Sequence, residues 1–202
     1  MPIHDAVFSP DSTILALAHG TVITLWDVEK NVLLKALDGG LSEAQHVGFV
    51  GDDGRYLVAS SGSRGLAVWD MLSCDGKLQT SVFIAKLISV VWTNVSAPCS
   101  RLVVSSDSPF FVAVHDPTDG KTGFSVYKPT SANAVRTVKA KGNIHRLVLL
   151  PSSSTSSAKD LQFAGISQAG EVYRFGDDIP KDAAVGSNTI RSAGEKGVSI
   201  WQ

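Results

Sequence analysis

The sequence predicts an all-β protein built from repeated four-stranded units. Two segments end alike, ITLWD at 23–27 and LAVWD at 66–70, and their Trp-Asp pairs lie 43 residues apart. Each ending follows short apolar or alternating runs separated by Gly, Pro, Asp and Ser, as strands and tight turns require. Neither segment shows helical periodicity. Self-similarity at this spacing indicates blades of a β-propeller, each of which buries its faces by stacking on its neighbours.

The first two units each supply four strand-like runs. These runs are 6–11, 14–18, 21–27 and 31–34 in the first unit, and 47–50, 56–59, 65–70 and 78–83 in the second. A Gly-Asp-Asp-Gly turn at 51–54 joins two runs of the second unit. We therefore interpret Asp52 and Asp53 as turn residues that hydrogen-bond their own backbone, rather than as a metal site.

A third and a fourth unit align with weaker signatures. The third unit has its inner strand at 89–92, its next strand at 101–105 and its third strand at 111–116, where His115 and Asp116 take the place of Trp-Asp. The fourth unit begins at 144–151, resumes at 161–164 and continues at 170–175, with Phe175-Gly176 in the Trp-Asp place. Residues 152–159 between these runs are almost entirely Ser, Thr and Ala, which predicts a surface loop.

The end of the chain contains a partial match. Residues 190–201 fall in step with 58–69, so they are either the central hairpin of another blade or a tail with chance similarity. We assign blades to 1–42, 43–86, 87–130 and 131–178, and treat 179–202 as a tail or partial blade.

Composition favours a packed protein that acts with partners. The chain is 44% hydrophobic and 18% charged, below the usual quarter of charged residues, which suits a surface covered by other molecules. Met1 is not followed by a basic start and an apolar run, and no apolar stretch approaches about 18 residues, so we expect a soluble intracellular protein without a membrane span. Cys74 and Cys99 lack ligand spacing, which predicts reduced thiols rather than a zinc site.

Motifs for enzymatic chemistry are absent from the sequence. It has no phosphate-binding Gly-rich loop with its Lys, no HExxH and no GxSxG, and the histidines at 4, 19, 46, 115 and 145 are dispersed. His46 and His145 stand near the beginnings of inner strands, where a ligand-facing role is the alternative to a structural one. We expect neither catalysis nor a cofactor.

Charge argues against a dedicated nucleic-acid binder. The chain has 18 Lys plus Arg against 19 Asp plus Glu, whereas direct binders carry a basic patch. The local exception comprises Arg136, Lys139, Lys141 and Arg146. These residues either contact a phosphate backbone or protect a solvated strand edge against pairing, and both interpretations stay open.

Aromatic residues divide into structural and partner-binding candidates. Trp26-Asp27 and Trp69-Asp70 are expected to pack between blades and to turn the chain, which identifies the fold and not the function. Phe110 follows a turn proline, so we expect it to lie exposed and to anchor a partner.

Several of these stretches together resemble a known family. Residues 6–27, 55–70 and 100–117 are similar to the second propeller of the nucleolar WD-repeat protein of the UtpA subcomplex of the small-subunit processome. The resemblance covers most of residues 6–176, and its most specific part is RLVVSS at 101–106 followed by PFFVAV at 109–114. It implies a non-catalytic nucleolar scaffold that holds pre-ribosomal RNA and assembly factors and supports rRNA transcription and processing.

The chain departs from the general WD pattern in two ways. Gly-His dipeptides are missing before the inner strands and the turns at 19–20 and 63–64 lack Asp, so we expect an incomplete polar network around the tryptophans. Four blades also fall short of the usual seven, so we expect an open ring whose uncovered faces pair with missing blades or a second chain. The alternative function is a generic adaptor, such as a substrate receptor of a ubiquitin ligase.

Overall fold

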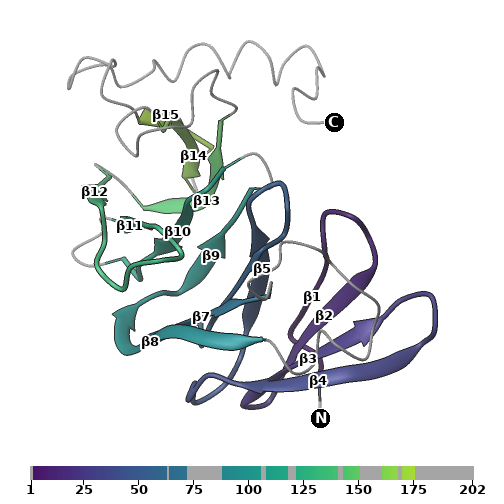
Figure 1. Ribbon diagram of the computed structural model, residues 1–202. Coiled ribbons are helices and arrows are strands. Elements are labelled where there is room, and N and C mark those ends of the chain that lie inside the picture. The colour runs from purple at the N-terminus through teal and green to yellow at the C-terminus, as the bar shows by residue number, and fades with distance from the viewer. Residues whose placement is uncertain are drawn as a thin grey trace. The chain divides into compact units, whose positions relative to one another are not determined.

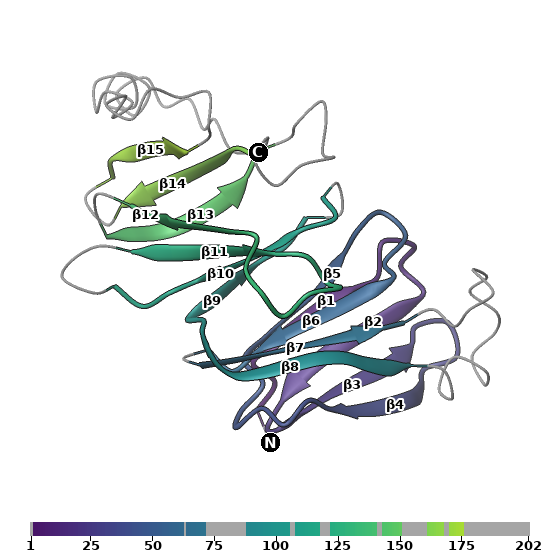
Figure 2. The same cartoon turned by 60° about the vertical axis from the view of Figure 1, so that its left-hand side comes forward.

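The all-β prediction is confirmed by the structure (Figure 1 and Figure 2). The computed structural model describes residues 2–62, 64–71, 88–105, 108–117, 122–140, 143–150, 161–167 and 170–175. These residues form fifteen strands in four antiparallel sheets, and none of them is helical. Accordingly, the described part of the chain contains no helix of the length and hydrophobicity that a membrane crossing requires.

The chain divides into two compact units. The first comprises Met1–Asp116 and Gly123–Val138 and contains the first three sheets, apart from the last residue of the third. The second comprises Pro117–Thr122 and Lys139–Gln202 and contains the fourth sheet.

The first sheet forms as the sequence predicts. Its strands are β1 (Asp5–Phe8), β2 (Ile14–His19), β3 (Val22–Asp27) and β4 (Val32–Asp38), paired in that order. Asp11 closes the turn between β1 and β2, because its Oδ1 accepts hydrogen bonds from Ser9 Oγ at 2.6 Å and from Thr13 N at 3.1 Å. Partial burial raises the pKa of the Asp11 carboxyl, but these hydrogen bonds outweigh it and the net pKa is lowered.

The second sheet differs from the prediction at its last strand. It contains β5 (His46–Val50), β6 (Tyr56–Ser60), β7 (Arg64–Asp70) and β8 (Ser89–Pro98) in that order. Residues 89–92 were expected to begin the third unit, and this is wrong because β8 pairs with β7. The apolar run at 90–92 looks like an inner strand, but the separation in sequence between Asp70 and its partner Ser89 breaks the constant repeat spacing. The expected strand at 78–83 lies outside the described residues.

The outer strands of the first two sheets, β4 and β8, are irregular. In β4 the register shifts between the partners of Leu25 and Trp26, and in β8 it shifts twice along β7. Extra residues of this kind are β-bulges, which leave backbone groups unpaired and increase the local twist of the strand.

The third sheet contains β9 (Arg101–Val103), β10 (Phe111–Val114), β11 (Gly123–Tyr127) and β12 (Arg136–Lys139). Residues 111–116 were expected to supply the third strand, but β10 is the second strand, counted from β9. The alignment of His115-Asp116 with the two Trp-Asp pairs is therefore wrong, because those pairs end third strands. Tyr127, at the end of β11, takes the position of the tryptophans instead.

The fourth sheet contains β13 (Ile144–Leu149), β14 (Phe163–Ser167) and β15 (Val172–Phe175). This strand order confirms the expected fourth unit, with Phe175 at the end of the third strand. The Ser-rich insertion 152–159 and the match at 190–201 lie outside the described residues.

A continuous apolar core joins the first and second sheets. Every second residue of β2 is buried in it, namely Ile14, Ala16 and Ala18, together with Ile23 and Leu25 of β3. The second sheet contributes Val47, Phe49, Leu57, Ala59, Ala67 and Trp69. The inner strands are also linked directly, because Asp5 Oδ2 accepts a hydrogen bond from Val47 N at 3.0 Å.

A second core joins the second and third sheets. It contains Val50, Val58, Leu66 and Val68 on one side and Phe111, Ala113 and Tyr127 on the other. Trp92 of β8 packs against this core and donates a hydrogen bond from Nε1 to the Pro129 carbonyl at 2.7 Å. His46 Nε2 and the Ser100 carbonyl oxygen, 3.1 Å apart, link the two inner strands.

Gly39 is required where the first sheet meets Trp69. A Cβ at this position would lie 2.6 Å from the Cβ of Ala67 and 2.7 Å from the indole Cζ2 of Trp69. We expect Gly39→Ala to reduce the free energy of unfolding by about 1–3 kcal/mol, because the packed sheets have to separate to admit the methyl group. Urea denaturation followed by circular dichroism measures this. Ser42→Ala, at an exposed neighbour, is the control, and equal midpoints would contradict the packing argument.

Gly48 sets the approach of the inner strand β5 to Val104. A Cβ at Gly48 would lie 2.5 Å from Val104 Cγ2 and 2.9 Å from Val104 Cγ1. We expect Gly48→Ala to lower the urea midpoint, and the double variant Gly48→Ala/Val104→Ala to recover part of the loss because both clashing methyl groups are removed. If the two substitutions are additive, the contact does not limit the spacing of these strands.

Candidate protein-interaction faces

The first Trp-Asp pair is held by a small polar network. Trp26 Nε1 donates a hydrogen bond to Thr24 Oγ1 at 3.1 Å, and His19 Nε2 lies 3.2 Å from the same hydroxyl. Thr24 thus connects two adjacent strands through their side chains. This network contains no Asp, as expected because the turn at 19–20 has no Asp to supply.

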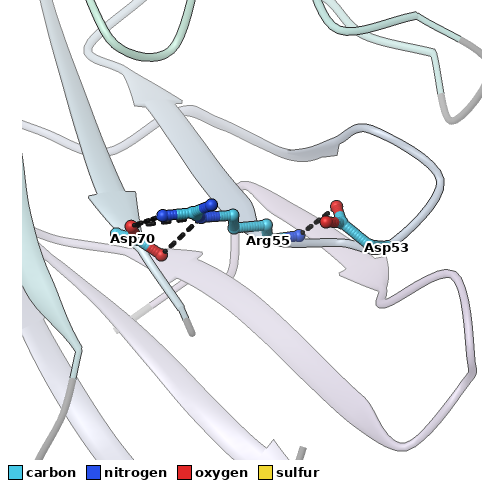
Figure 3. Close-up of polar contacts among 3 residues, drawn as sticks. All are labelled: Asp53, Arg55 and Asp70. Carbon is cyan, nitrogen blue, oxygen red and sulfur yellow. Dashed lines mark hydrogen bonds and ion pairs between the residues drawn. The ribbon is translucent and has the colours of Figure 1, made fainter. Parts of the chain in front are cut away.

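The second Trp-Asp pair is held by an ion pair. The guanidinium of Arg55 contacts both carboxylate oxygens of Asp70, with Nη2–Oδ2 at 2.9 Å and Nε at 3.2 Å from each oxygen (Figure 3). The backbone N of Arg55 also donates to Asp53 Oδ1 at 2.9 Å, which confirms the turn role of Asp53. The hydrogen bond to Asp70 raises the pKa of Arg55 above its ordinary value. This fork ties the turn before β6 to the end of β7.

Tyr127 is the aromatic residue that the sequence reasoning missed. Its ring stacks on Phe111 with the centroids 5.4 Å apart, and Trp92 lies 6.0 Å from Tyr127 and 6.1 Å from Phe111. Burial raises the pKa of the Tyr127 hydroxyl. The signal that could have found it is the alternating run at 123–127, which has the strand pattern but ends in Tyr-Lys rather than Trp-Asp.

Phe110 does not have the exposure expected of a partner anchor. Its side chain is 1% exposed, so that expectation is wrong. The turn at 108–110 directs the ring inward, with Phe110 N bonded to Ser108 Oγ at 3.2 Å. The ammonium of Lys128 lies 5.6 Å from the ring centroid and covers it from outside.

The candidate basic residues lie in different places. Arg136 is half-buried on β12 in the first unit, whereas Lys139 and Arg146 are exposed and belong to the second unit. Lys141 lies outside the described residues. Contact between these residues and RNA or protein stays a prediction.

Three histidines of the first unit make side-chain contacts with neighbouring residues. His4 Nε2 lies 3.1 Å from Glu43 Oε1, and His19 and His46 have the contacts given above. Burial lowers the pKa of the His115 imidazole. His145, in the second unit, is exposed. Among the described residues, no three His, Cys, Asp or Glu side chains come together in a group that could hold a metal ion.

Cys99 is a buried thiol. It is 0% exposed, its Sγ donates to the Arg101 carbonyl at 3.2 Å, and burial raises its pKa to about 11. The neutral thiol therefore predominates near neutral pH. Cys74 lies outside the described residues.

Exposed apolar side chains recur where the outer strands begin. We define the apolar rim as Val32 and Leu33 of β4, Val90 and Val91 of β8, and Val135 before β12. The five side chains are between 36% and 52% exposed. They share one end of the first unit, because each outer strand begins beside the end of the third strand of its sheet. Asp70 pairs with Ser89, so the Arg55–Asp70 fork lies at the same end.

The first sheet has a second exposed apolar surface. Because Ile14, Ala16 and Ala18 face the core, the residues between them face the opposite side of the sheet. We define the outer face by Phe8, Leu15, Leu17 and Trp26, in which Leu15 pairs with both Phe8 and Trp26. Phe8 is 54% exposed and the other three are half-buried.

Comparisons with solved structures show the fold. The chain is similar to the "Myceliophteria thermophila Cps50 (Swd1) beta-propeller domain", with TM-score 0.59 and 7% identity over 84% of this chain and 49% of that one. It is similar to Saccharomyces cerevisiae Sqt1, with TM-score 0.62 and 11% identity over 86% and 44% of the two chains. A third match is Kuenenia stuttgartiensis hydrazine synthase, with TM-score 0.53 and 12% identity over 86% and 53%.

These comparisons support a propeller of WD type. The chain spans about half the length of the solved structures that it matches. A search of curated proteins gave no match. Among protein families, residues 2–164 match the one described as "WD repeat-containing protein 75 second beta-propeller". The chain therefore belongs to the family of the second β-propeller of WD repeat-containing protein 75.

Proposed function

We propose that this WD-repeat chain is a non-catalytic scaffold in ribosome biogenesis, where it contacts proteins of the small-subunit processome. The family supports a WD-repeat scaffold, and the sequence resemblance supports the ribosome-assembly role. The observation that carries the proposal is the apolar rim, since exposed apolar side chains gathered at one end of three sheets are typical of a protein-binding surface.

The chemistry of the rim favours a protein over RNA. Four of its five members are valines, and two charged groups at the same end, Arg55 and Asp70, are paired with each other. A surface that binds a phosphate backbone instead needs cations that release counterions, and the chain as a whole carries a formal net charge of −1. Contact with pre-rRNA is therefore indirect or weak in this proposal.

The surroundings of the rim match the composition of interface centres. Arg55 stacks over the ring of Tyr56, with its guanidinium carbon 5.1 Å from the ring centroid. Arginine and tyrosine are enriched at binding hot spots, and a paired, preoriented arginine loses little side-chain freedom on binding. We infer that Arg55 and Tyr56 flank the apolar contact. The proposal places the protein in the nucleolus.

A pull-down from nucleolar extract tests the function. The tagged chain should capture UtpA-type processome proteins equally with and without RNase, identified by mass spectrometry. The double variant Val90→Lys/Val91→Lys should reduce their recovery by about tenfold or more, because it places two charges in an apolar contact. Thr93→Lys, at an exposed position further along β8, is the matched control.

Three results would count against the proposal. These are recovery that requires RNA, recovery of ubiquitin-ligase subunits in place of processome proteins, and equal losses in the rim and control variants. Circular dichroism of each variant separates loss of binding from loss of folding.

A further inference from the structure

The first two sheets carry a surplus of carboxylates at the end where the apolar rim lies. In each sheet this end holds the turn between the first two strands and the end of the third strand, since Ile14 pairs with Asp27 and Tyr56 pairs with Asp70. The described residues of these turns and strand ends include six carboxylates and two cations. The carboxylates are Asp11, Asp27, Glu29, Asp52, Asp53 and Asp70, and the cations are Lys30 and Arg55.

The carboxylates nearest the inner strands and the apolar rim occupy different zones of this end. We define the acidic turns by Asp11, Asp52 and Asp53, which lie between the first and second strands of their sheets. These turns touch each other, because a Cβ at Gly54 would lie 2.7 Å from Pro10 Cδ. The rim residues of the same sheets lie on the outermost strands, β4 and β8. Since neighbouring strands are about 4.8 Å apart, about 10 Å separates the two zones.

Cations balance part of this negative charge. Asp27 Oδ2 lies 3.7 Å from Lys30 Nζ, and Asp70 is held by the fork from Arg55. The other four carboxylates form no ion pair with any residue that the structure describes. Lys128 lies at the same end of the third sheet, so the surplus of negative charge belongs to the first two sheets.

Turn hydrogen bonds fix two of the acidic side chains before any partner binds. Asp11 Oδ1 accepts hydrogen bonds from Ser9 Oγ and Thr13 N, and Asp53 Oδ1 accepts one from Arg55 N (Figure 3). A carboxylate has further acceptor positions, so both side chains can still bind a cation. Because they are already ordered, such binding costs little side-chain entropy.

We propose that this end of the first two sheets binds a basic amphipathic helix of a partner protein, with the aliphatic side chains of the helix on the apolar rim and its Lys or Arg side chains on the acidic turns. The inference rests on the proposed scaffold function and deepens it by naming the kind of segment that the rim takes. An α-helix with its side chains is about 10–12 Å across, which matches the separation of the two zones.

Charge complementarity favours this occupant over the alternatives. The phosphate backbone of RNA would meet four carboxylates that are not ion-paired, so the surface opposes it. A second copy of the chain would present the same acidic end, and like charges then oppose a symmetric contact through this end. A basic helix instead gains from both zones, because apolar burial supplies affinity and the opposite charges fix its orientation.

Two labelled peptides test the charge requirement. The Lys peptide has Leu at positions i, i+3, i+4 and i+7 of a helix, with Lys and Ala elsewhere, and the Glu peptide has Glu in place of each Lys. Fluorescence anisotropy with the purified chain should show that the Lys peptide binds about tenfold or more tightly than the Glu peptide, and that added salt reduces the difference by screening. Equal affinities, or no binding of the Lys peptide, overturn the proposal.

Charge-reversal variants locate the contact. Asp52→Lys and Glu29→Lys replace exposed carboxylates at the rim end, and each should weaken binding of the Lys peptide by about threefold to tenfold. Asp116→Lys makes the same change of charge at an exposed position beyond the opposite end of β10 and is the matched control. Equal losses in the control and the rim-end variants would mean attraction to net charge alone and would contradict the assigned site. Circular dichroism verifies that each variant is folded.

The pull-down separates this inference from the proposed function. If Val90→Lys/Val91→Lys reduces recovery of processome proteins and Asp52→Lys does not, the scaffold function stands and the basic helix is wrong. If neither variant reduces recovery, the rim is not the binding surface and both proposals fail. Losses with both variants, and none with Asp116→Lys, support the two proposals together.

Discussion

The packing of large aromatic rings of one sheet on the preceding sheet is the contact on which the rest of the structure depends. Trp69 illustrates it, because its indole is 2% exposed and lies against the segment that leaves the first sheet at Gly39. Tyr127 has the same place in the next core, stacked on Phe111 and close to Trp92. Burial of these rings holds each sheet at a fixed distance from the next, and hydrogen bonds from Asp5 and His46 then link the inner strands.

Much of the fold can be predicted from the sequence where local pattern and strand pairing agree. The first sheet and the three strands of the fourth follow their apolar runs, because each run is bounded by Gly, Pro, Asp or Ser. The third unit could not be placed in the same way. Asp70 and Ser89 pair although they are far apart in sequence, so a constant period assigned β8 to the wrong sheet. The partner of a strand is not visible in its own residues. Tyr127 was missed for a related reason, since packing requires a large ring at that position and not a tryptophan.

The surface features were harder to predict than the core. Phe110 was expected to be exposed because it follows Pro109, yet the turn directs its ring inward and Lys128 covers it. The apolar rim and the outer face were not found as surfaces, because the alternation of apolar residues along a strand does not show which side remains uncovered. Only the structure shows which side is uncovered. Phe8 and Phe49 hold equivalent positions in the first and second sheets, yet Phe8 is exposed and Phe49 is buried.

The irregular outer strands bear on how the protein avoids fibre formation. β4 and β8 lie at the edges of their sheets, and an unprotected sheet edge recruits strands from other molecules into continuous sheets. The register shifts in both strands interrupt the regular spacing of donors and acceptors that such recruitment requires. β8 contains no charged residue over its ten positions, so its two shifts provide the protection that Lys35 and Asp38 provide in β4. A variant with a regular β8 would keep its core and become prone to amyloid-like aggregation.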